Sequence, residues 1–341
     1  MHPDIEKAMK KSFEEMSLRD YRSYMTIAKY TPKDIAGWLH AEGGMIGQTN
    51  AVNAVSSVIY SHFHFPLRPK RNLLLIGRTG CGKSELMRAC QRFFASALNP
   101  KIAEKMITCV DSTQLNAVGW RGGVKLCDIL KDSSTENQLP YGKLIFFDEF
   151  DKLCETRWAG GGNGSSWSVN HMIQEQLLTM LDHQLLQLSN EDGTQHFTVD
   201  TQRLSIVCMG AFSSIREQKQ KTHRSIGFSA VDCTNATADS SEITTALEQY
   251  GVMTEVCGRL DPIEMTDVTD EMMYNIAVKT VKELNNAGKD LYTVSVPEQK
   301  LHALAATAIS KGLGGRYIRN TLNRLFDEAV FENPCRDEFV L

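Results

Sequence analysis

Eight consecutive residues have the types and spacing of a phosphate-binding loop. They run Gly77-Arg78-Thr79-Gly80-Cys81-Gly82-Lys83-Ser84 and match the pattern G-x-x-x-x-G-K-[ST]. The glycines let successive backbone N–H groups point inward around phosphates, at the start of a helix that already favours anions. Lys83 is expected to reach the β- and γ-phosphates, and the Ser84 hydroxyl to bind Mg²⁺. The pattern predicts a nucleotide-binding P-loop with contacts from Gly77, Thr79, Gly80, Cys81, Gly82, Lys83, Ser84 and Glu85.

A pair of carboxylates follows the second apolar run after the P-loop. Residues 143–147 lead directly into Asp148 and Glu149. A buried strand would deliver both to the carboxyl edge of a parallel sheet, where ligands of open α/β folds bind. We expect Asp148 to hold Mg²⁺ through its water shell and Glu149 to orient and polarise the attacking water. Two solvated acids at a strand end are the alternative, but the P-loop upstream favours ATP hydrolysis.

Alternating strands and helices would position these residues. Short apolar runs predict strands at 73–76, 107–110, 144–147 and 204–209, with helical segments between them. Strands separated by helices indicate a parallel sheet with helices on both faces. Two stretches, 158–167 and 216–241, are too polar and aperiodic to belong to this sheet.

The pattern changes to helices after Pro262. Apolar residues recur at helical spacing in three segments, 272–284, 301–309 and 318–330, and residues 292–296 alternate like an edge strand. Near the N-terminus, residues 31–34 look like a helix start and 48–63 like an amphipathic helix. We predict a helical extension over 1–40, an α/β large domain over 41–262, and a small, mainly helical C-terminal domain over 263–341.

The composition is that of an ordinary globular chain. It has 341 residues, 42% of them hydrophobic, and 37 basic against 41 acidic residues give a net charge of −4. That charge disfavours nucleic acid and anionic membranes as partners, and no apolar run approaches the roughly 18 residues of a membrane span. The charged N-terminus is unlike a signal peptide, so we expect a cytoplasmic protein. The nine cysteines form no C-x-x-C pair, which disfavours zinc and favours reduced, mostly buried thiols.

Further segments resemble the AAA+ ATPases, and among these the ClpX/HslU unfoldases, with ClpX the better fit. They occur in the family's order across about residues 31–334. The resembling segments are Thr31-Pro32-Lys33-Asp34-Ile35 and Met45-Ile46-Gly47-Gln48 around the adenine, the D-E-x-D-K segment at 148–152, the helix at 174–178 after the second pore loop, the sensor-1 strand end at 209–212, the arginine-finger segment at 258–262, and the sensor-2 segment Gly314-Gly315-Arg316.

The resemblance implies an ATP-driven homo-hexameric ring that pulls polypeptides through its axial pore. Met45 and Ile46 would line the adenine pocket, with ATP and Mg²⁺ as cofactors. Arg259 would join Glu149 in catalysis by reaching the γ-phosphate of a neighbouring subunit, although a lone arginine is otherwise usually a surface ion pair. Arg316 would contact the nucleotide from the small domain, and Arg319, one turn further on, is a second candidate for that role.

Two loops are implied to handle polypeptides. Gly119-Trp120-Arg121-Gly122 stands where the family has Gly-Tyr-Val-Gly, the loop that grips substrate, and the alternative is a tryptophan in the core. Ile226-Gly227-Phe228, inside the polar stretch 216–241, matches the family's loop that docks on a ClpP-like peptidase. Its alternative is a small apolar cluster under a long loop.

The chain departs from the family where substrate would be read. The cysteines of the family's N-terminal zinc-binding domain are missing, and residues 187–200 are short and acidic where the family has a basic pore-entrance loop. The sensor-1 position carries Cys208-Met209, with no obvious polar group. Three functions stay open: a protein unfoldase that feeds a ClpP-like peptidase, a peptidase-independent remodeller of one dedicated complex, and a nucleic-acid motor, which the net charge disfavours.

Overall fold

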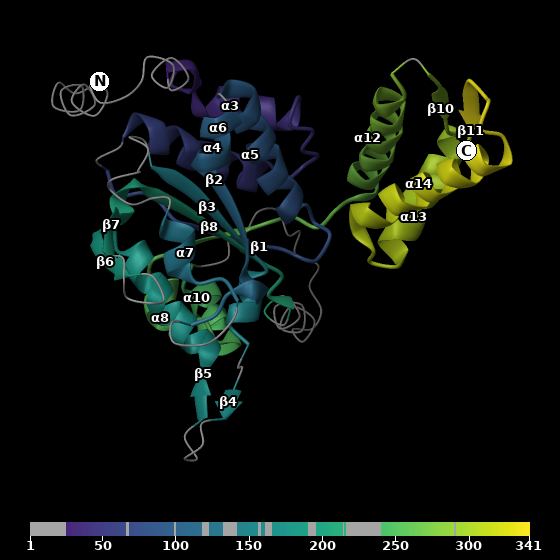
Figure 1. Cartoon of the computed structure of the whole chain (residues 1–341). Helices are drawn as coiled ribbons and strands as arrows, with labels where there is room; N and C mark the ends of the chain where they lie inside the picture. The colour runs from purple at the N-terminus through teal and green to yellow at the C-terminus, as the bar shows by residue number, and fades with distance from the viewer. Residues whose placement is uncertain are drawn as a thin grey trace, which may run out of the picture.

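A five-stranded parallel sheet forms the centre of the large domain (Figure 1). The computed structural model describes residues 25–65, 68–98, 100–117, 123–131, 142–155, 158–160, 166–189, 196–213, 215, 240–289 and 291–341. The strands lie in the order β2-β3-β8-β1-β9, and each neighbouring pair is parallel. Their bounds are β1 Leu73–Ile76, β2 Ile107–Asp111, β3 Lys143–Asp148, β8 Leu204–Gly210 and β9 Asp261–Glu264. The predicted α/β class is confirmed, as are the four strands predicted within it.

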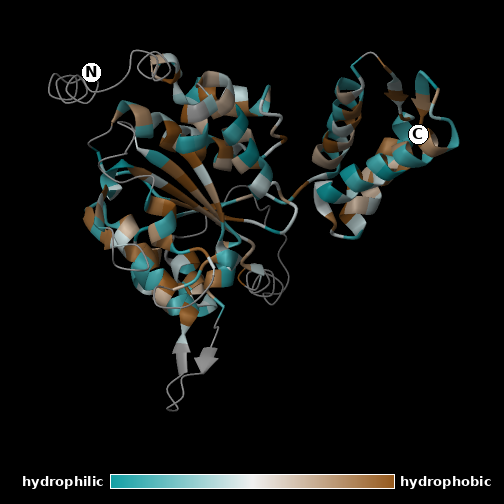
Figure 2. Cartoon of the chain, viewed as in Figure 1, coloured by the Kyte–Doolittle hydropathy of each residue, from teal (hydrophilic) through white to brown (hydrophobic). Residues whose placement is uncertain are grey.

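Helices cover both faces of the sheet because alternate side chains of each strand point to opposite sides. Leu73 and Leu75 of β1 belong to the core on one face, whereas Leu74 and Ile76 belong to the core on the other. Figure 2 shows the strands as a largely apolar layer between the helices. The first face is covered by α3 Pro32–His40, α4 Thr49–His64, α5 Lys83–Ala97 and α6 Pro100–Met106, and the second by α7 Leu126–Lys131, α8 Val169–Leu181, α10 Ser240–Tyr250 and α11 Thr254–Cys257. Short 3₁₀ turns follow strands at η1 Ser112–Gln114 and η2 Phe150–Leu153 and precede β8 at η3 Thr201–Arg203.

Helix α3 begins where the sequence predicts a helix start. The Thr31 hydroxyl accepts a hydrogen bond from the Asp34 N–H at 3.2 Å, and the Asp34 carboxylate accepts one from the Thr31 N–H at 2.8 Å. This reciprocal cap satisfies backbone donors that the first turn of a helix leaves without partners. The amphipathic helix predicted at 48–63 is confirmed as α4.

Strand β9 was missed by the sequence prediction. It pairs in parallel with β1, with Leu74 opposite Pro262, and forms one edge of the sheet. Proline has no N–H to donate, so within a sheet it is confined to edges, bulges and strand starts, and its presence argues against a strand when only the sequence is read. The strand is also only four residues long and partly exposed, without the apolar run that marks the others.

Two antiparallel ribbons lie outside the main sheet. β4 Trp158–Gly160 pairs with β5 Ser166–Ser168 and extends away from the body of the domain, beyond α8 (Figure 1). This agrees with the expectation that 158–167 does not belong to the sheet. β6 Leu185–Ser189 pairs with β7 His196–Asp200. Most of the other polar stretch, 216–239, lies outside the described residues.

The C-terminal part of the chain is mainly helical, as predicted. Helices α12 Asp270–Gly288, α13 Glu298–Ser310 and α14 Gly314–Glu332 share a core that includes Met273, Leu301 and Ile318. The alternating segment at 292–296 is confirmed as a strand, since β10 Thr293–Ser295 pairs with β11 Glu338–Val340. Figure 1 shows this small domain beside the large one, joined to it by the segment after β9. The residue numbers predicted for the domain boundaries stay a prediction.

Two expectations from composition can be compared with the described residues. Eight cysteines are described and all are free thiols; six are buried, Cys109 is partly buried and Cys335 is exposed. Burial raises the pKa of the Cys109 and Cys257 thiols to about 11, so both are protonated at neutral pH. No helix in the described part of the chain is long and apolar enough to cross a membrane.

Candidate nucleotide site

A cleft of about 660 Å³ opens between the carboxyl edge of the sheet and the small domain. The large domain contributes the P-loop residues from Thr79 to Glu85 and the strand ends after β3 and β8. The small domain contributes side chains of α12 and α14. Of the residues predicted to act on nucleotide, those that line this cleft are Met45, Ile46, Thr79, Gly80, Cys81, Gly82, Lys83, Ser84, Glu85, Asp148, Glu149, Arg316 and Arg319.

The P-loop has the backbone that phosphate binding requires. Gly80 and Gly82 have φ angles of +85° and +108°, which glycine adopts readily because it has no Cβ atom. Helix α5 starts directly afterwards, at Lys83. The Lys83 ammonium donates to the carbonyl oxygens of Gly77 and Arg78, the latter at 3.1 Å, so it lies folded over the loop. Gly77 does not line the cleft itself but anchors the loop by donating its N–H to Gly210 O at 3.2 Å.

The P-loop and the acidic pair meet at the predicted magnesium position. Ser84 Oγ donates to Asp148 Oδ2 at 2.7 Å, and the Glu149 N–H donates to Asp148 Oδ1 at 3.0 Å. The Ser84 hydroxyl and the Asp148 carboxylate thus lie close enough to face one ion. Both are hard oxygen ligands, which Mg²⁺ takes alongside water and phosphate, so these residues fit that ion. Glu149 is exposed and has a left-handed backbone with φ of +54°. A non-glycine residue held in this conformation is a strained position of the kind found at functional sites.

The end of β8 is tied to the acidic turn after β3. Asp151 is 4% exposed, and its Oδ1 accepts a hydrogen bond from the Ala211 N–H at 3.1 Å. Cys208 and Met209 are fully buried, so they do not reach the cleft. The exposed Ser213 does line it and supplies a hydroxyl near this strand end. The segment predicted from sequence, 209–212, ended one residue before Ser213 and therefore missed it.

Gln48 joins the P-loop to the segment that leads into the small domain. Its side chain is 3% exposed, and its Nε2 donates to Cys81 O at 2.9 Å and to Thr266 O at 2.7 Å. Its Oε1 accepts from the Thr266 N–H at 2.9 Å. One buried amide thus satisfies its own hydrogen bonds and fixes two backbone segments that are far apart in the sequence.

The small-domain wall of the cleft carries several cations. Arg316 lines the cleft and makes no ion pair with another described residue, whereas Arg319 pairs with Glu283 at 3.5 Å. Lys279 of this wall also lines the cleft, as does Arg88 from α5 of the large domain, and both were missed from the sequence. The spacing of Lys279 and Glu283 predicts only an ion pair within their own helix, because charges four residues apart on a helix lie side by side. No signal in the sequence indicates that Lys279 also reaches the large domain.

Arg259 is separate from this cleft. Its guanidinium donates to the Asp182 carboxylate and, from Nη1, to Glu255 O at 2.8 Å. Its side chain is 37% exposed, and it is not among the residues that line the cleft of its own chain. The ion pair considered as its alternative role is therefore present.

The two predicted polypeptide-handling loops lie outside the described residues. These are Gly119-Trp120-Arg121-Gly122 and Ile226-Gly227-Phe228. The described segments that flank the first of them are joined, since Asn116 N–H donates to Val124 O and Val124 N–H to Gln114 O, each at 2.9 Å. These flanking segments therefore lie side by side.

Comparison with known proteins decides the family. A family model described as an AAA domain (Cdc48 subfamily) matches residues 68–263, more than half of the chain. The chain belongs to the AAA family. It is an AAA+ ATPase, and its similarity to ClpX extends beyond that domain. A Borrelia duttonii protein named ATP-dependent Clp protease ATP-binding subunit ClpX is 24% identical over 89% of this chain and 75% of its own length.

Other relatives give the same picture of a distant, nearly full-length similarity. The protein of that name from Treponema denticola is 23% identical over 89% of this chain and 77% of its own length. ClpX 2 of Wolinella succinogenes is 25% identical over 95% of this chain and 82% of its own length. The predicted resemblance to ClpX-like AAA+ ATPases is confirmed.

Proposed function

We propose that this AAA+ ATPase binds ATP and Mg²⁺ in the cleft and uses hydrolysis to unfold and translocate proteins. The hydrogen bond between Ser84 and Asp148 carries the nucleotide part of the proposal, because it joins the P-loop to the acidic strand end inside a cleft of nucleotide size. The nearly full-length similarity to ClpX supports the part that concerns proteins as substrates. Glu149 stands next to this pair with its side chain exposed.

Each of these side chains has a definite task in the proposed reaction. Ser84 would hold Mg²⁺ directly and Asp148 would hold it through its water shell, and the bound ion would offset negative charge on the phosphates. Lys83 exchanges its bonds to the Gly77 and Arg78 carbonyls for phosphate oxygens. Glu149 accepts a hydrogen bond from the attacking water and so orients it toward the γ-phosphate. Arg316 contacts the nucleotide from the small domain.

Glu149→Gln tests the catalytic assignment. We expect ATP turnover to fall by about 100-fold or more, because an amide is a poor general base, while ATP affinity stays within about threefold. Glu328→Gln, on an exposed part of α14, is the matched control and should leave both quantities unchanged. Retention of turnover in Glu149→Gln would contradict the assignment.

We propose further that the chain forms a homo-hexamer in which Arg259 acts in a neighbouring subunit. Its position outside its own cleft supports this, since it has no access to the nucleotide of its own chain. Arg259→Ala and Glu149→Gln should each be inactive alone, yet regain measurable ATP turnover when mixed. In the mixture, subunits with intact Glu149 receive Arg259 from their neighbours. Failure to regain turnover in assemblies shown to contain both variants would remove Arg259 from this role.

Threading of polypeptide is assigned to the loop that contains Trp120. An aromatic side chain between glycines can press on an extended chain without reading its sequence. Trp120→Ala should abolish ATP-dependent unfolding of a stable fluorescent protein and leave ATP turnover within about threefold. Unfolding at the normal rate would exclude Trp120 from gripping substrate.

Docking to a ClpP-like peptidase is assigned to Ile226-Gly227-Phe228. Phe228→Ala should abolish degradation of a tagged substrate by added ClpP-type peptidase while unfolding continues. Phe331→Ala, which removes a phenylalanine that is 86% exposed on α14, is the matched control. Degradation that survives Phe228→Ala would reject the docking assignment.

A peptidase-independent remodeller is the second candidate. The ribbon of β6 and β7 favours it, because neither strand contains a lysine or arginine where the resembled family has a basic entrance loop. A remodeller would keep every activity in Phe228→Ala. Glu149→Gln would then retain one defined complex from its native lysate, rather than assorted polypeptides with a peptidase.

A further inference from the structure

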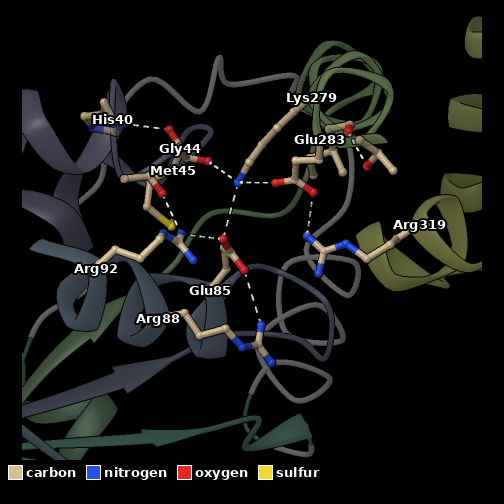
Figure 3. A network of polar contacts seen from close by, with 12 residues as sticks. His40, Gly44, Met45, Glu85, Arg88, Arg92, Lys279, Glu283 and Arg319 are labelled. Atoms are coloured by element: carbon tan, nitrogen blue, oxygen red, sulfur yellow. Dashed lines mark hydrogen bonds and ion pairs between the residues drawn. The ribbon is translucent and has the colours of Figure 1, made fainter. Parts of the chain in front are cut away.

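Glu85, the residue after Ser84, is the centre of a charged network at the mouth of the cleft (Figure 3). Its Oε1 accepts from Arg92 at 2.7 Å and from Lys279 at 3.3 Å, and its Oε2 accepts from Arg88 at 3.2 Å. Burial raises the pKa of the Glu85 carboxyl, but the hydrogen bond from Arg92 and the charge of Lys279 outweigh this and lower it overall. The carboxylate is therefore ionised at neutral pH.

Two members of this network hold the Gly43 and Gly44 carbonyls beside the predicted adenine pocket, and His40 separately contacts the next carbonyl, that of Met45. Arg92 donates to Gly43 O at 2.6 Å, Lys279 donates to Gly44 O at 2.9 Å, and His40 Nδ1 lies 3.0 Å from Met45 O. Figure 3 shows these side chains converging on that segment from α3, α5 and α12. The segment continues directly into Ile46, and both Met45 and Ile46 line the cleft.

Lys279 is the member of this network that reaches from the small domain to the large one. Its Nζ lies 3.6 Å from Glu283 of its own helix, and Glu283 also accepts from Arg319 at 3.5 Å. Arg319 and Lys279 thus both contact Glu283. Lys279 also reaches across to Glu85 and Gly44 O of the large domain. Its side chain is 25% exposed, so these contacts are less screened by water than an ordinary surface pair.

We propose that Lys279 and Glu85 are positioning residues. They couple the position of the small domain on the large one to the shape of the pocket wall formed by Met45 and Ile46. Lys279 places α12 against the large domain and fixes Gly44 O in the same contact. Glu85 holds Lys279 and, through Arg92, also Gly43 O. The inference deepens the proposed function and rests on the nucleotide site described above. Neither residue touches the reacting phosphate in this scheme, so the expected effect is on nucleotide affinity.

Lys279→Met tests this directly, because methionine keeps most of the length and removes the charge and the donors. We expect the dissociation constant for ADP with a fluorescent group on its ribose to rise about tenfold, while kcat at saturating ATP stays within about threefold. Lys279→Arg should restore most of the affinity, since a guanidinium can donate to both Glu85 and Gly44 O. Lys282→Met removes an exposed lysine from the same helix and should have no effect.

A double-mutant cycle with Glu85→Gln decides whether Lys279 acts through Glu85. The loss caused by Lys279→Met should shrink to about threefold or less in the Glu85→Gln background, because the two changes remove the same contact. An undiminished loss in that background would overturn the role of Glu85. An ADP affinity unchanged by Lys279→Met would overturn the whole inference.

Lys83→Met separates these failures from a failure of the proposed function. Loss of ADP binding in Lys83→Met together with normal binding in Lys279→Met would leave the nucleotide site in place and reject the positioning pair. Normal ADP binding in Lys83→Met would reject the site itself. Equal melting temperatures of the variants would exclude unfolding as the cause of any loss.

Discussion

The two walls of the cleft differ in how they are held. The P-loop wall grows out of β1, whose residues are at most 1% exposed, and its shape is set by backbone conformation at Gly80 and Gly82. The small-domain wall is held by the long side chain of Lys279, which reaches over from α12 to Gly44 O and Glu85. The first wall is fixed by one packed core, whereas the second depends on how two separate cores are seated on one another.

This difference gives each wall a different task. Backbone N–H groups on a buried strand and a helix start cannot rearrange without unfolding the core, which suits phosphate binding. Polar contacts between two domains can exchange at a cost of about 1 kcal/mol each, which suits a wall that follows the nucleotide state.

Lys83→Met breaks the P-loop wall and carries the largest expected effect. ATP and ADP affinity should fall by about 100-fold or more, because the ammonium that faces the phosphates is lost from a partly buried site. Titration with fluorescent ADP measures the loss. The control is Lys282→Met, and a loss below about tenfold would mean that the backbone alone binds the phosphates.

Gln48→Ala cuts the connection between the walls and should have the next largest effect. Removing the amide leaves Cys81 O, Thr266 O and the Thr266 N–H without their buried partner. We expect the free energy of unfolding to fall by about 2–4 kcal/mol in denaturant titration, together with a loss of ADP affinity. Gln187→Ala, on the β6 ribbon, serves as the control and should change neither quantity. If the variant is fully folded under the assay conditions and its ADP affinity is unchanged, Thr266 and the P-loop move independently.

Gly314→Ala probes a close backbone contact between the two walls and should have a moderate effect. A Cβ on Gly314 would lie 2.8 Å from Gly80 Cα, which forces the start of α14 away from the P-loop. We expect ADP affinity to fall about tenfold, equivalent to about 1.4 kcal/mol. Gly312→Ala is a close control, because Gly312 also has a positive φ but open space around its Cβ position. Gly312→Ala should cost about 1 kcal/mol of stability without loss of affinity, and equal losses in both variants would point to backbone strain alone.

Lys70→Met concerns only the core behind the P-loop wall and should have the smallest effect. Burial lowers the pKa of Lys70 from 10.5 to about 8, so between these values the unfolded chain binds the proton that the folded chain has lost. The free energy of unfolding contributed by this residue therefore rises with pH across that window, by of the order of 1 kcal/mol. Melting curves of both proteins at about pH 7.5 and 9.5, on either side of the lowered pKa, measure it. The free energy of unfolding of the wild type minus that of Lys70→Met should become more positive as the pH rises. A difference that stays constant would contradict the lowered pKa of Lys70.

Much of the large domain could be predicted from the sequence because its signals are local. The run at 73–76 became β1 with the predicted bounds, and Lys83 became the first residue of α5. Phosphate binding needs residues that are adjacent in the chain, so the P-loop is readable without a structure. β9 was missed because Pro262 and a short, partly exposed segment contain no strand signal until β1 is present to pair with it.

Residue types and their spacing were enough to predict most of the candidate nucleotide site: the P-loop, the acidic pair, and the alternation of strands and helices that carries them. Apart from Arg316 and Arg319, the residues that close the site from the small domain became visible only in the folded chain. Lys279 is 194 positions from Glu85, and Gln48 is 218 positions from Thr266. No periodicity relates such pairs, because their contact depends on how separately packed cores come to rest against each other. The phosphate-binding loop can be predicted because its residues are adjacent in the chain. The contacts between the two domains form only after both have folded.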